Sequence, residues 1–333
     1  MAGGGDSKSA VLYALAVNAF MTSIKFVVAS ISGSGSMFAE AMHTLADTAN
    51  QTLLFIGITK SDKPANQMFS YGYGVERFFY ALMSAVGIFV LGCGVTMYHG
   101  IHGLLHPAPM RPVGWYIWAT LVLGFVLNGL VLNKAVTEIN KSRGDQKFME
   151  YLKKTNDPTI SAVLLEDGIA CLGIVVAAAC IGLSAHYRTP VFDSIGSILI
   201  GILLGGVAVF LGYKNRSLIL GQRIPEHVEA EAIGYVRAQP SVEEVHAVQS
   251  RVLGADKFKL KAEVDWDGRW FGEQLAPWVE ENKDKYKTEE GRLEMAREFG
   301  EKIAEAIGDE IDRIEIELKK NIPGLAYLDF ESD

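Results

Sequence analysis

The chain has 333 residues, 49% of them hydrophobic, and a mean hydropathy of +0.18, which is enough for a membrane-embedded part and a separate soluble part. Residues 1–221 carry 15 Lys and Arg against 12 Asp and Glu, a formal charge of +3, whereas residues 222–333 carry 16 against 27, a charge of −11. This acidic balance excludes a nucleic-acid-binding role, because phosphates require a basic surface, and three cysteines that all lie in apolar runs exclude a disulfide framework or a CxxC-type zinc site.

Six apolar segments are each long enough to cross a hydrocarbon core of about 30 Å, which takes about 20 helical residues. The predicted membrane helices are 10–31, 36–59, 77–99, 113–134, 159–185 and 191–213. Residues 1–9 show neither the basic segment nor the cleavage site of a signal peptide, so we expect the first apolar run to be a retained helix. The expected fold of residues 1–221 is therefore an α-helical polytopic membrane domain with six transmembrane helices.

Basic residues are concentrated on one side of these predicted helices. That side contains Lys8, Lys60, Lys63, Lys141, Arg143, Lys147, Lys153, Lys154, Lys214, Arg216 and Arg223. The other side contains Arg111 and Arg188. The positive-inside rule then predicts an integral multi-pass protein with both termini in the cytoplasm or its equivalent. The pattern does not distinguish a plasma or inner membrane from an organelle membrane.

The acidic part, residues 222–333, has the pattern of a small α+β domain. A helix is predicted over 225–239, a long charged helix over roughly 288–308, and strands over 243–253, 257–266 and 325–331. We predict no structure for the insertion at 267–287, which contains two of the tryptophans. The order α-β-β-α-β indicates a cytoplasmic sandwich of two helices on one sheet.

Charged residues interrupt the second predicted helix, where a bilayer makes them costly by about 2.5–3.5 kcal/mol each, and such residues usually mark a pathway or a site. Glu40, His43 and Asp47 stand at i, i+3 and i+7 and share one helix face, and Gln51 extends that stripe by another turn. His43 and Asp47, one turn apart, are a sensible half-site for a single metal ion. The spacing alone is common, and the position in mid-membrane is what gives it weight.

The fifth predicted helix contains the second acidic group, Glu166 and Asp167. One imidazole and several carboxylates on two facing helices can supply the tetrahedral N/O shell that zinc accepts, and without thiolates the ion is released easily. We take His43, Asp47 and Asp167 as predicted ligands. Neighbouring residues point about 100° apart on a helix, so Glu166 either reaches the same ion, gates access to it, or pairs with a basic group. A structural network of ion pairs is the alternative for all four residues.

Four stretches together resemble the cation diffusion facilitator family of metal–proton antiporters, and within it the zinc transporter nine branch. They are SGSGSMFAEAMHTLADTANQTLLFIGITKSDKPA, FSYGYGVERFFYALMSAVGIF, DPTISAVLLEDGIACLG and PVFDSIGSILIG, which cover most of residues 30–215. The resemblance implies a secondary active transporter that exports a divalent metal cation, most readily Zn²⁺, in exchange for protons by alternating access. It also implies a ferredoxin-like cytoplasmic domain, a homodimer, no enzymatic activity and no cofactor beyond the transported ion.

The family places a ligand pair one turn apart on each of the two helices. His43 and Asp47 match the first pair and Asp167 matches half of the second, but Val163 stands where its partner is expected, and Glu166 stands next to Asp167 instead. The fourth ligand and the metal preference therefore stay open, with zinc favoured over manganese by the imidazole, and cobalt, nickel, iron and cadmium possible. The family's tail often binds further metal, but this tail offers His227, His246 and Asp329, and we expect no metal cluster in it.

Several other polar residues have structural interpretations. We expect Lys25 to form an ion pair with a membrane carboxylate rather than to extend to the membrane surface. We expect Glu40 to be a partner of Lys25 or Arg77 rather than a carboxylate on the entry path. Asp193 is expected to cap the sixth helix, and Cys171 to be a small buried residue rather than a ligand. At the far end of the third helix stands a cluster of three histidines, His99, His102 and His106. We expect this cluster to lie in a solvated loop. The alternative is that it collects or releases metal.

Binding a cation requires the imidazole and carboxylates to lose protons, and release lets them take protons back, so alternating access would couple metal movement to a proton gradient.

Three other classes of protein stay open. An intramembrane metalloenzyme would need a catalytic base and an open metal position, as in HExxH, and no such pattern occurs. A metal-gated channel or sensor differs from a transporter in its kinetics. A scaffold without transport is disfavoured by the intact set His43, Asp47 and Asp167.

Overall fold

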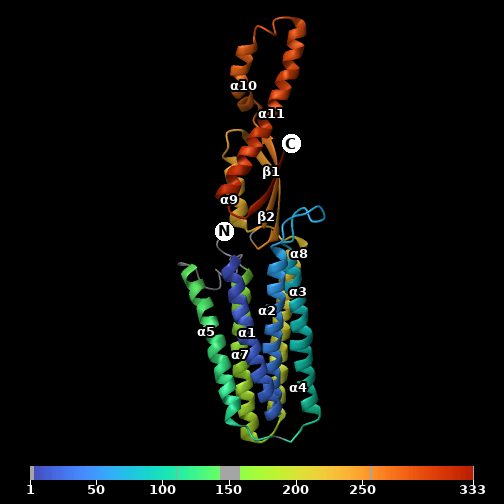
Figure 1. Ribbon diagram of the computed structural model, residues 1–333, viewed down its shortest axis with the longest axis vertical. Helices are drawn as coiled ribbons and strands as arrows, with labels where there is room; N and C mark the ends of the chain where they lie inside the picture. Colours follow the sequence, from blue (N-terminus) through green and yellow to red (C-terminus); the bar gives the residue numbers. More distant parts are fainter. Residues whose placement is uncertain (1–3, 110, 143–157, 256, 333) are drawn as a thin grey trace. The chain divides into compact units, whose positions relative to one another are not determined.

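The computed structural model describes residues 4–109, 111–142, 158–255 and 257–332, except for the side chains of residues 4–14, 135, 138, 139, 141, 142 and 158–165. The chain divides into two compact units, Met1–Ile219 and Leu220–Asp333. The first unit is helical, and the second combines helices with a three-stranded sheet (Figure 1).

The described helices of the first unit match all six predicted segments, with α5 beginning two residues after the predicted start at 113, which confirms the helical prediction. They are α1 (Gly4–Ser32), α2 (Gly35–Ser61), α3 (Glu76–Gly87), η1 (Ile88–Val95), α4 (Thr96–Leu105), α5 (Trp115–Ser142), α7 (Pro158–Tyr187) and α8 (Val191–Leu220). The third predicted segment is the continuous run of α3, the π-helical η1 and α4. A π-helical turn inside a long helix often marks a functional site.

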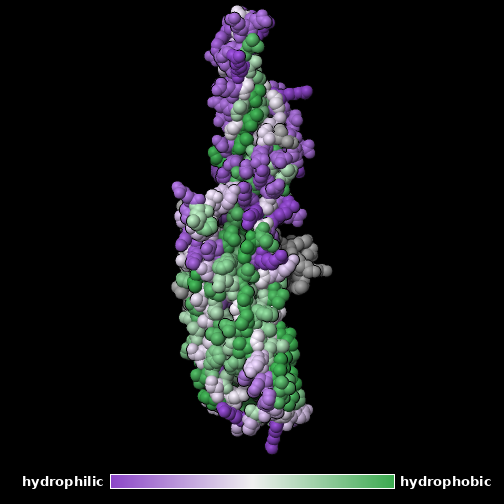
Figure 2. All heavy atoms as spheres, turned by 90° about the vertical axis from the view of Figure 1, so that its right-hand side faces the viewer, coloured by the Kyte–Doolittle hydropathy of each residue, from purple (hydrophilic) through white to green (hydrophobic). Residues whose placement is uncertain are grey.

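Five helices of the described chain are long and apolar enough to cross a membrane: Leu15–Ser32, Glu76–Leu105, Trp115–Lys134, Glu166–Tyr187 and Val191–Leu220. Figure 2 shows apolar side chains over much of the face of the helical unit that it presents. The remaining predicted span, α2, has 27 residues and thus the length. It lacks the apolarity because of its polar stripe, in which Glu40 and His43 are buried and Asp47 and Gln51 are half-buried. The unit is thus a polytopic membrane fold with a polar helix among apolar ones.

α2 packs against α1, α3, η1, α4 and α7. A buried apolar cluster surrounds the first turns of α2 and stabilises the bundle there. The cluster includes Met37, Ile117, Ile181 and Ile200 from α2, α5, α7 and α8. Close approach depends on Gly196 of α8, where a Cβ atom would lie 2.4 Å from Ser36 Oγ and 2.7 Å from Cys180 Cβ. Small residues allow such contacts between membrane helices, which gain no hydrophobic energy from leaving lipid.

The second unit is an α+β domain, as predicted. Its elements are α9 (Glu226–Arg237), β1 (Val242–Gly254), β2 (Lys257–Trp266), α10 (Gly268–Asn282), α11 (Glu289–Asn321) and β3 (Leu325–Ser332). The sheet order is β1-β2-β3, with β1 antiparallel and β3 parallel to β2. The order α-β-β-α-β is confirmed, and the insertion at 267–287 contains the additional helix α10, which Asp267 caps through the backbone N–H groups of Arg269 and Trp270.

The prediction for α11 was wrong at its C-terminal end, because the helix continues to Asn321 rather than stopping near residue 308. The extra turns read DEIDRIEIELKK, in which charged and apolar residues partly alternate as they do in a strand. Burial decides the outcome. Ile314 and Leu318, at i and i+4, are 0% and 1% exposed in the core of the unit, together with Val236 of α9 and Leu260 of β2.

Glu310 of α11 is an acidic residue inside this unit, 8% exposed. Arg313 donates to both of its carboxylate oxygens, from Nε at 2.7 Å and Nη2 at 2.8 Å, and Ser241 Oγ donates at 2.6 Å. Arg313 and Ser241 lower the pKa of Glu310 from its ordinary value of 4.5. A depressed folded-state pKa means that the carboxylate stabilises the unit above the ordinary value, and that this contribution is lost as pH falls through the folded-state pKa.

We expect Glu310→Gln to weaken the second unit by about 1.5–3 kcal/mol, the usual contribution of a hydrogen bond to a charged group, at neutral pH, and by less at acidic pH. Hydrogen–deuterium exchange of the full-length protein in detergent should show faster exchange in peptides of α9, β1 and α11. Glu305→Gln on the same helix is the matched control, because its ion pair with Lys302 is exposed. Equal exchange in the two variants would contradict the role assigned to Glu310.

Candidate metal centre

The polar stripe of α2 is tied to α1 by a buried ion pair. Lys25 is 2% exposed and Glu40 is 0% exposed, and Lys25 Nζ donates to Glu40 Oε2 at 3.0 Å and to Thr44 Oγ1 at 2.8 Å. This confirms the predicted ion pair of Lys25 with a membrane carboxylate and identifies Lys25, not Arg77, as the partner of Glu40. The attraction between two opposite charges buried together offsets part of the desolvation cost that each incurs.

His43 and Asp47 lie one turn further along the same face. His43 is 4% exposed, and its Nε2 atom lies 3.5 Å from Asp47 Oδ2. The side chain of Asp47 is 28% exposed. This juxtaposition follows from helical spacing, because side chains at i and i+4 lie above one another. The pair can therefore offer a nitrogen and an oxygen ligand to one ion.

α7 brings the second acidic group to the same region. Asp47, Glu166 and Asp167 line one cavity of about 450 Å³, together with residues of α1, α2, α5 and α7. The three carboxylates are close enough to repel one another electrostatically. The prediction that the second and fifth helices face each other across the polar stripe is thus matched by the geometry. Val163, where the family's fourth ligand is expected, is among the side chains that the structure does not describe.

Glu166 is held toward α2 by a residue that the sequence analysis overlooked. Asn50 is 6% exposed, and its Nδ2 donates to Glu166 Oε1 at 3.3 Å and Oε2 at 3.4 Å. Asn50 Oδ1 in turn accepts from Ser84 Oγ of α3 at 2.7 Å. Asn50 stands at i+3 from Asp47 and so continues the stripe. That spacing was the signal that could have identified it.

The four predicted ligands do not converge on a point. Among the described residues, three ligand atoms come within 4.8 Å of one another in the group of Glu244, His246 and Asp265, and not in the helical unit. The arrangement in the helical unit is a ligand pair on α2 and an acidic pair on α7 around a cavity. Such an arrangement can attract a divalent cation, because its carboxylates repel one another until a positive charge joins them.

The group in the second unit was not anticipated. Glu244 and Asp265 are opposite each other in the antiparallel pairing of β1 and β2, and His246 Nδ1 lies 4.0 Å from Asp265 Oδ2. The expectation of no metal cluster in the tail considered His227, His246 and Asp329, which the sequence keeps apart. Strand register supplies two acidic neighbours for His246 that a count of histidines does not reveal.

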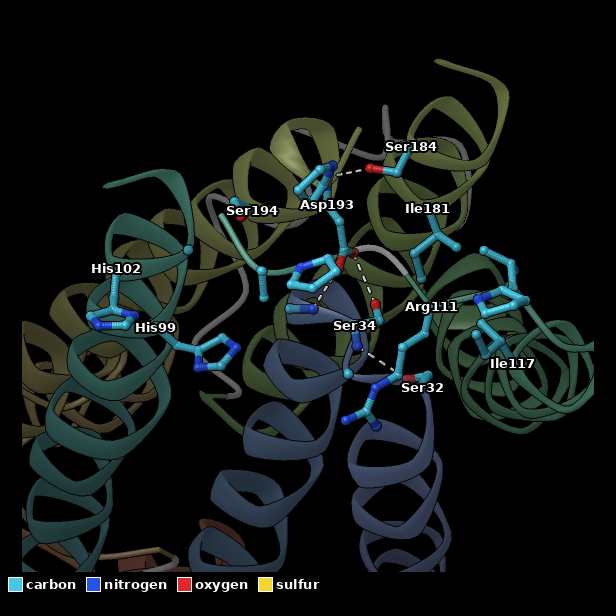
Figure 3. Close-up of a pocket in the computed structure, with 18 of the residues that line it drawn as sticks. Ser32, Ser34, His99, His102, Arg111, Ile117, Ile181, Ser184, Asp193 and Ser194 are labelled. Carbon is cyan, nitrogen blue, oxygen red and sulfur yellow. Dashed lines mark hydrogen bonds between the residues drawn. The ribbon is translucent and has the colours of Figure 1, made fainter. Parts of the chain in front are cut away.

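A second cavity, of about 360 Å³, lies at the opposite end of the first unit from residues 60–76 (Figure 3). His99, His102 and His106 line it, and all three are exposed. The expected loop is wrong for His99 and His102, which lie on α4, and His106 is the residue that ends this helix. Asp193 lies at the wall of the cavity. Asp193 Oδ1 accepts from Ser34 Oγ at 2.9 Å and from the Ser36 N–H at 3.0 Å, and Oδ2 accepts from the Gly35 N–H at 2.5 Å.

The expectation that Asp193 caps its own helix was therefore wrong, because this side chain caps the N-terminus of α2. The first N–H groups of a helix have no partner within the helix and carry partial positive charge, so a carboxylate is a favourable partner. Its own backbone N–H donates to Ser184 Oγ of α7 at 2.8 Å. Asp193 thus links the start of α8 to α2 and α7.

Comparison with known proteins gives one family and several similar proteins. The cation efflux transmembrane domain model matches residues 11–220. The chain is 38% identical over 329 residues to "Proton-coupled zinc antiporter SLC30A9, mitochondrial" of Mus musculus, and equally to that of Homo sapiens, covering 96% of this chain and 58% of each relative. It is 33% identical to "Metal tolerance protein C4" of Arabidopsis thaliana, covering 98% and 73%. It is 27% identical to "Magnetosome protein MamM" of Magnetospirillum gryphiswaldense, covering 81% and 91%. The chain thus spans 58% of the length of the first-named relatives.

We expect Asp193→Ala to destabilise the helical unit by on the order of 2 kcal/mol or more, because three donors lose a charged acceptor. Cys171 and Cys180 are buried thiols, so a thiol-reactive fluorophore can follow thermal unfolding of the detergent-solubilised protein. Ser184→Ala, which removes one neutral hydrogen bond, should cost only about 1 kcal/mol. An unchanged unfolding temperature for Asp193→Ala would show that the cap is not important for stability.

Proposed function

The chain belongs to the cation efflux family, and from this membership we propose that it is a membrane transporter that exchanges zinc for protons at a site formed by His43, Asp47, Asp167 and Glu166. The observation that carries the proposal is the position of His43 Nε2, 3.5 Å from Asp47 Oδ2, beside a cavity that Asp47 shares with the acidic pair of α7. Cation efflux is a transport process, so the intramembrane metalloenzyme is set aside.

Zinc is the proposed cargo because of the donor set. An imidazole nitrogen with carboxylate oxygens suits zinc, whereas magnesium, calcium and manganese prefer oxygen shells. The names of the relatives from mouse and human specify zinc and protons. The ligand role of Glu166 is supported by the bonds from Asn50, which hold its carboxylate toward α2.

Exchange for protons follows from the chemistry of the same ligands. A carboxylate or an imidazole binds zinc only after losing its proton, so zinc entry releases protons and zinc exit allows protons to return. Asp47, Glu166 and Asp167 line a cavity, with His43 beside Asp47, and a bound divalent cation would draw α2 and α7 together. We propose that this approach of the two helices is the step that closes the site on one side of the membrane before it opens on the other.

The positive-inside pattern supports an orientation with both termini on the cytoplasmic side, and a cytoplasmic location for residues 222–333. We also propose a homodimer. Membership of the cation efflux family is what supports this assembly.

In proteoliposomes containing a zinc dye or a pH dye, we expect zinc movement to be accompanied by an opposite movement of protons. Asp47→Ala and Asp167→Ala should each reduce zinc transport at least about tenfold, which corresponds to a loss of only 1.4 kcal/mol. Asp62→Ala, the same change at the exposed end of α2, is the control. A metal panel on the same vesicles tests cobalt, nickel, iron, cadmium and manganese. Zinc flux without proton movement at any pH would refute the coupling, and full flux in both variants would refute the site.

For Glu166, we expect Glu166→Gln to raise the dissociation constant for zinc in detergent, measured by calorimetry, by about tenfold or more. Asn50→Ala should raise it by about tenfold, since groups that orient metal ligands typically contribute tenfold to hundredfold in affinity. If zinc affinity stays unchanged while the transport rate falls, Glu166 is a gate and not a ligand.

A further inference from the structure

Glu40 has one carboxylate oxygen whose partner is not accounted for. The side chain is 0% exposed, and Oε2 accepts from Lys25 Nζ. Oε1 has no hydrogen-bond partner among the described residues. Leaving a buried acceptor unpaired costs free energy, more so when it is charged. An orphaned oxygen of this kind, one turn before a proposed ligand, points to a partner present in another state of the protein.

The surroundings of this oxygen identify His43 as that partner. A Cβ atom on Gly173 of α7 would lie 2.8 Å from Glu40 Oε1 and 3.8 Å from His43 Nδ1. Both atoms therefore lie against the same residue of α7, which leaves room for them because it lacks a side chain. Glu40 and His43 stand at i and i+3 on α2, a spacing at which helical side chains meet.

The two nitrogens of His43 face different groups. Nε2 lies 3.5 Å from Asp47 Oδ2, on the side of the proposed ion, and Nδ1 lies on the side of Gly173 and Glu40. A histidine that binds a metal through one ring nitrogen almost always donates the other N–H to a carboxylate, a backbone carbonyl or water, which determines the tautomer and the orientation of the ring.

We propose that Glu40 is a positioning residue for zinc binding. With zinc on His43 Nε2, the Nδ1–H group donates to Glu40 Oε1, so the lone pair of Nε2 is directed at the ion. Lys25 holds the carboxylate through Oε2 and balances its charge, while its second bond, to Thr44 Oγ1, anchors the ammonium group. This inference rests on the proposed function, since it requires His43 to be a zinc ligand.

A structural role alone, in which the Lys25–Glu40 pair merely joins α1 to α2, predicts a different outcome. Two double variants separate the roles: Lys25→Met with Glu40→Gln, and Lys25→Met with Glu40→Leu. Both remove the ion pair and both charges, so they lose the same helix–helix attraction. Only glutamine keeps an oxygen that can accept the Nδ1–H bond.

We expect calorimetry on the detergent-solubilised full-length protein to give a zinc dissociation constant about tenfold to hundredfold higher for the leucine double variant than for the glutamine one. In vesicles, the difference should be found in KM for zinc. Equal affinities would overturn the proposal. In a His43→Ala background the difference should vanish if Glu40 acts through His43, and a difference that persists there would also overturn it.

The reference variant His43→Ala by itself separates a failure of the ligand assignment from a failure of the role of Glu40. If it binds zinc as tightly as the wild type, the ligand assignment in the proposed function fails. If it binds weakly while the two double variants are equal, only the role of Glu40 fails.

A measurement on the unaltered protein covers the case in which the variants do not fold. NMR of ¹⁵N-histidine-labelled protein with saturating zinc should show one histidine, assigned to His43, protonated at Nδ1 and metal-bound at Nε2. A zinc-bound His43 protonated at Nε2 would overturn the proposal.

Discussion

A charged side chain inside a bilayer must be compensated by the protein, and this constraint organises the helical unit around α2. Three of its polar side chains meet a partner from another helix or one turn away: Glu40 meets Lys25 of α1, His43 meets Asp47, and Asn50 meets Glu166 of α7. The N-terminus of α2 meets Asp193 of α8. The least apolar helix is therefore the one that the others surround, because lipid could not satisfy any of these groups.

The same network holds an ion pair beside the proposed ligand groups. Lys25 and Glu40 form this pair, and both side chains are buried. In the proposed mechanism, His43, Asp47, Glu166 and Asp167 are the groups that exchange protons for a cation. In that mechanism, a carboxylate held in place by Lys25 allows the imidazole to keep its orientation while the ion enters and leaves.

The second unit is stabilised by the burial of an apolar core. Its apolar core lies between α9, α11 and one face of the sheet, and its acidic residues are mostly exposed. Where an acidic residue is buried, as with Glu310, an arginine and a serine complete its hydrogen bonds. The register of β1 and β2 also brings Glu244 and Asp265 next to His246, a grouping that depends on pairing and not on any local motif.

The apolar spans, the acidic α+β tail and the stripe with Glu40, His43 and Asp47 could be predicted from the residues alone, because helical periodicity and the cost of membrane charges act locally along the chain. The sequence also indicated the ion pair of Lys25, since a lone cation in a span requires a carboxylate. Four features became evident in the folded chain. Asp193 caps α2, and Asn50 donates to Glu166. α11 extends past residue 308, and Oε1 is the oxygen of Glu40 that lacks a partner among the described residues. These features depend on how helices far apart in the chain are rotated and how closely they pack. A difference of a few ångströms in packing selects one hydrogen-bond partner over another, and a local sequence pattern does not contain that information.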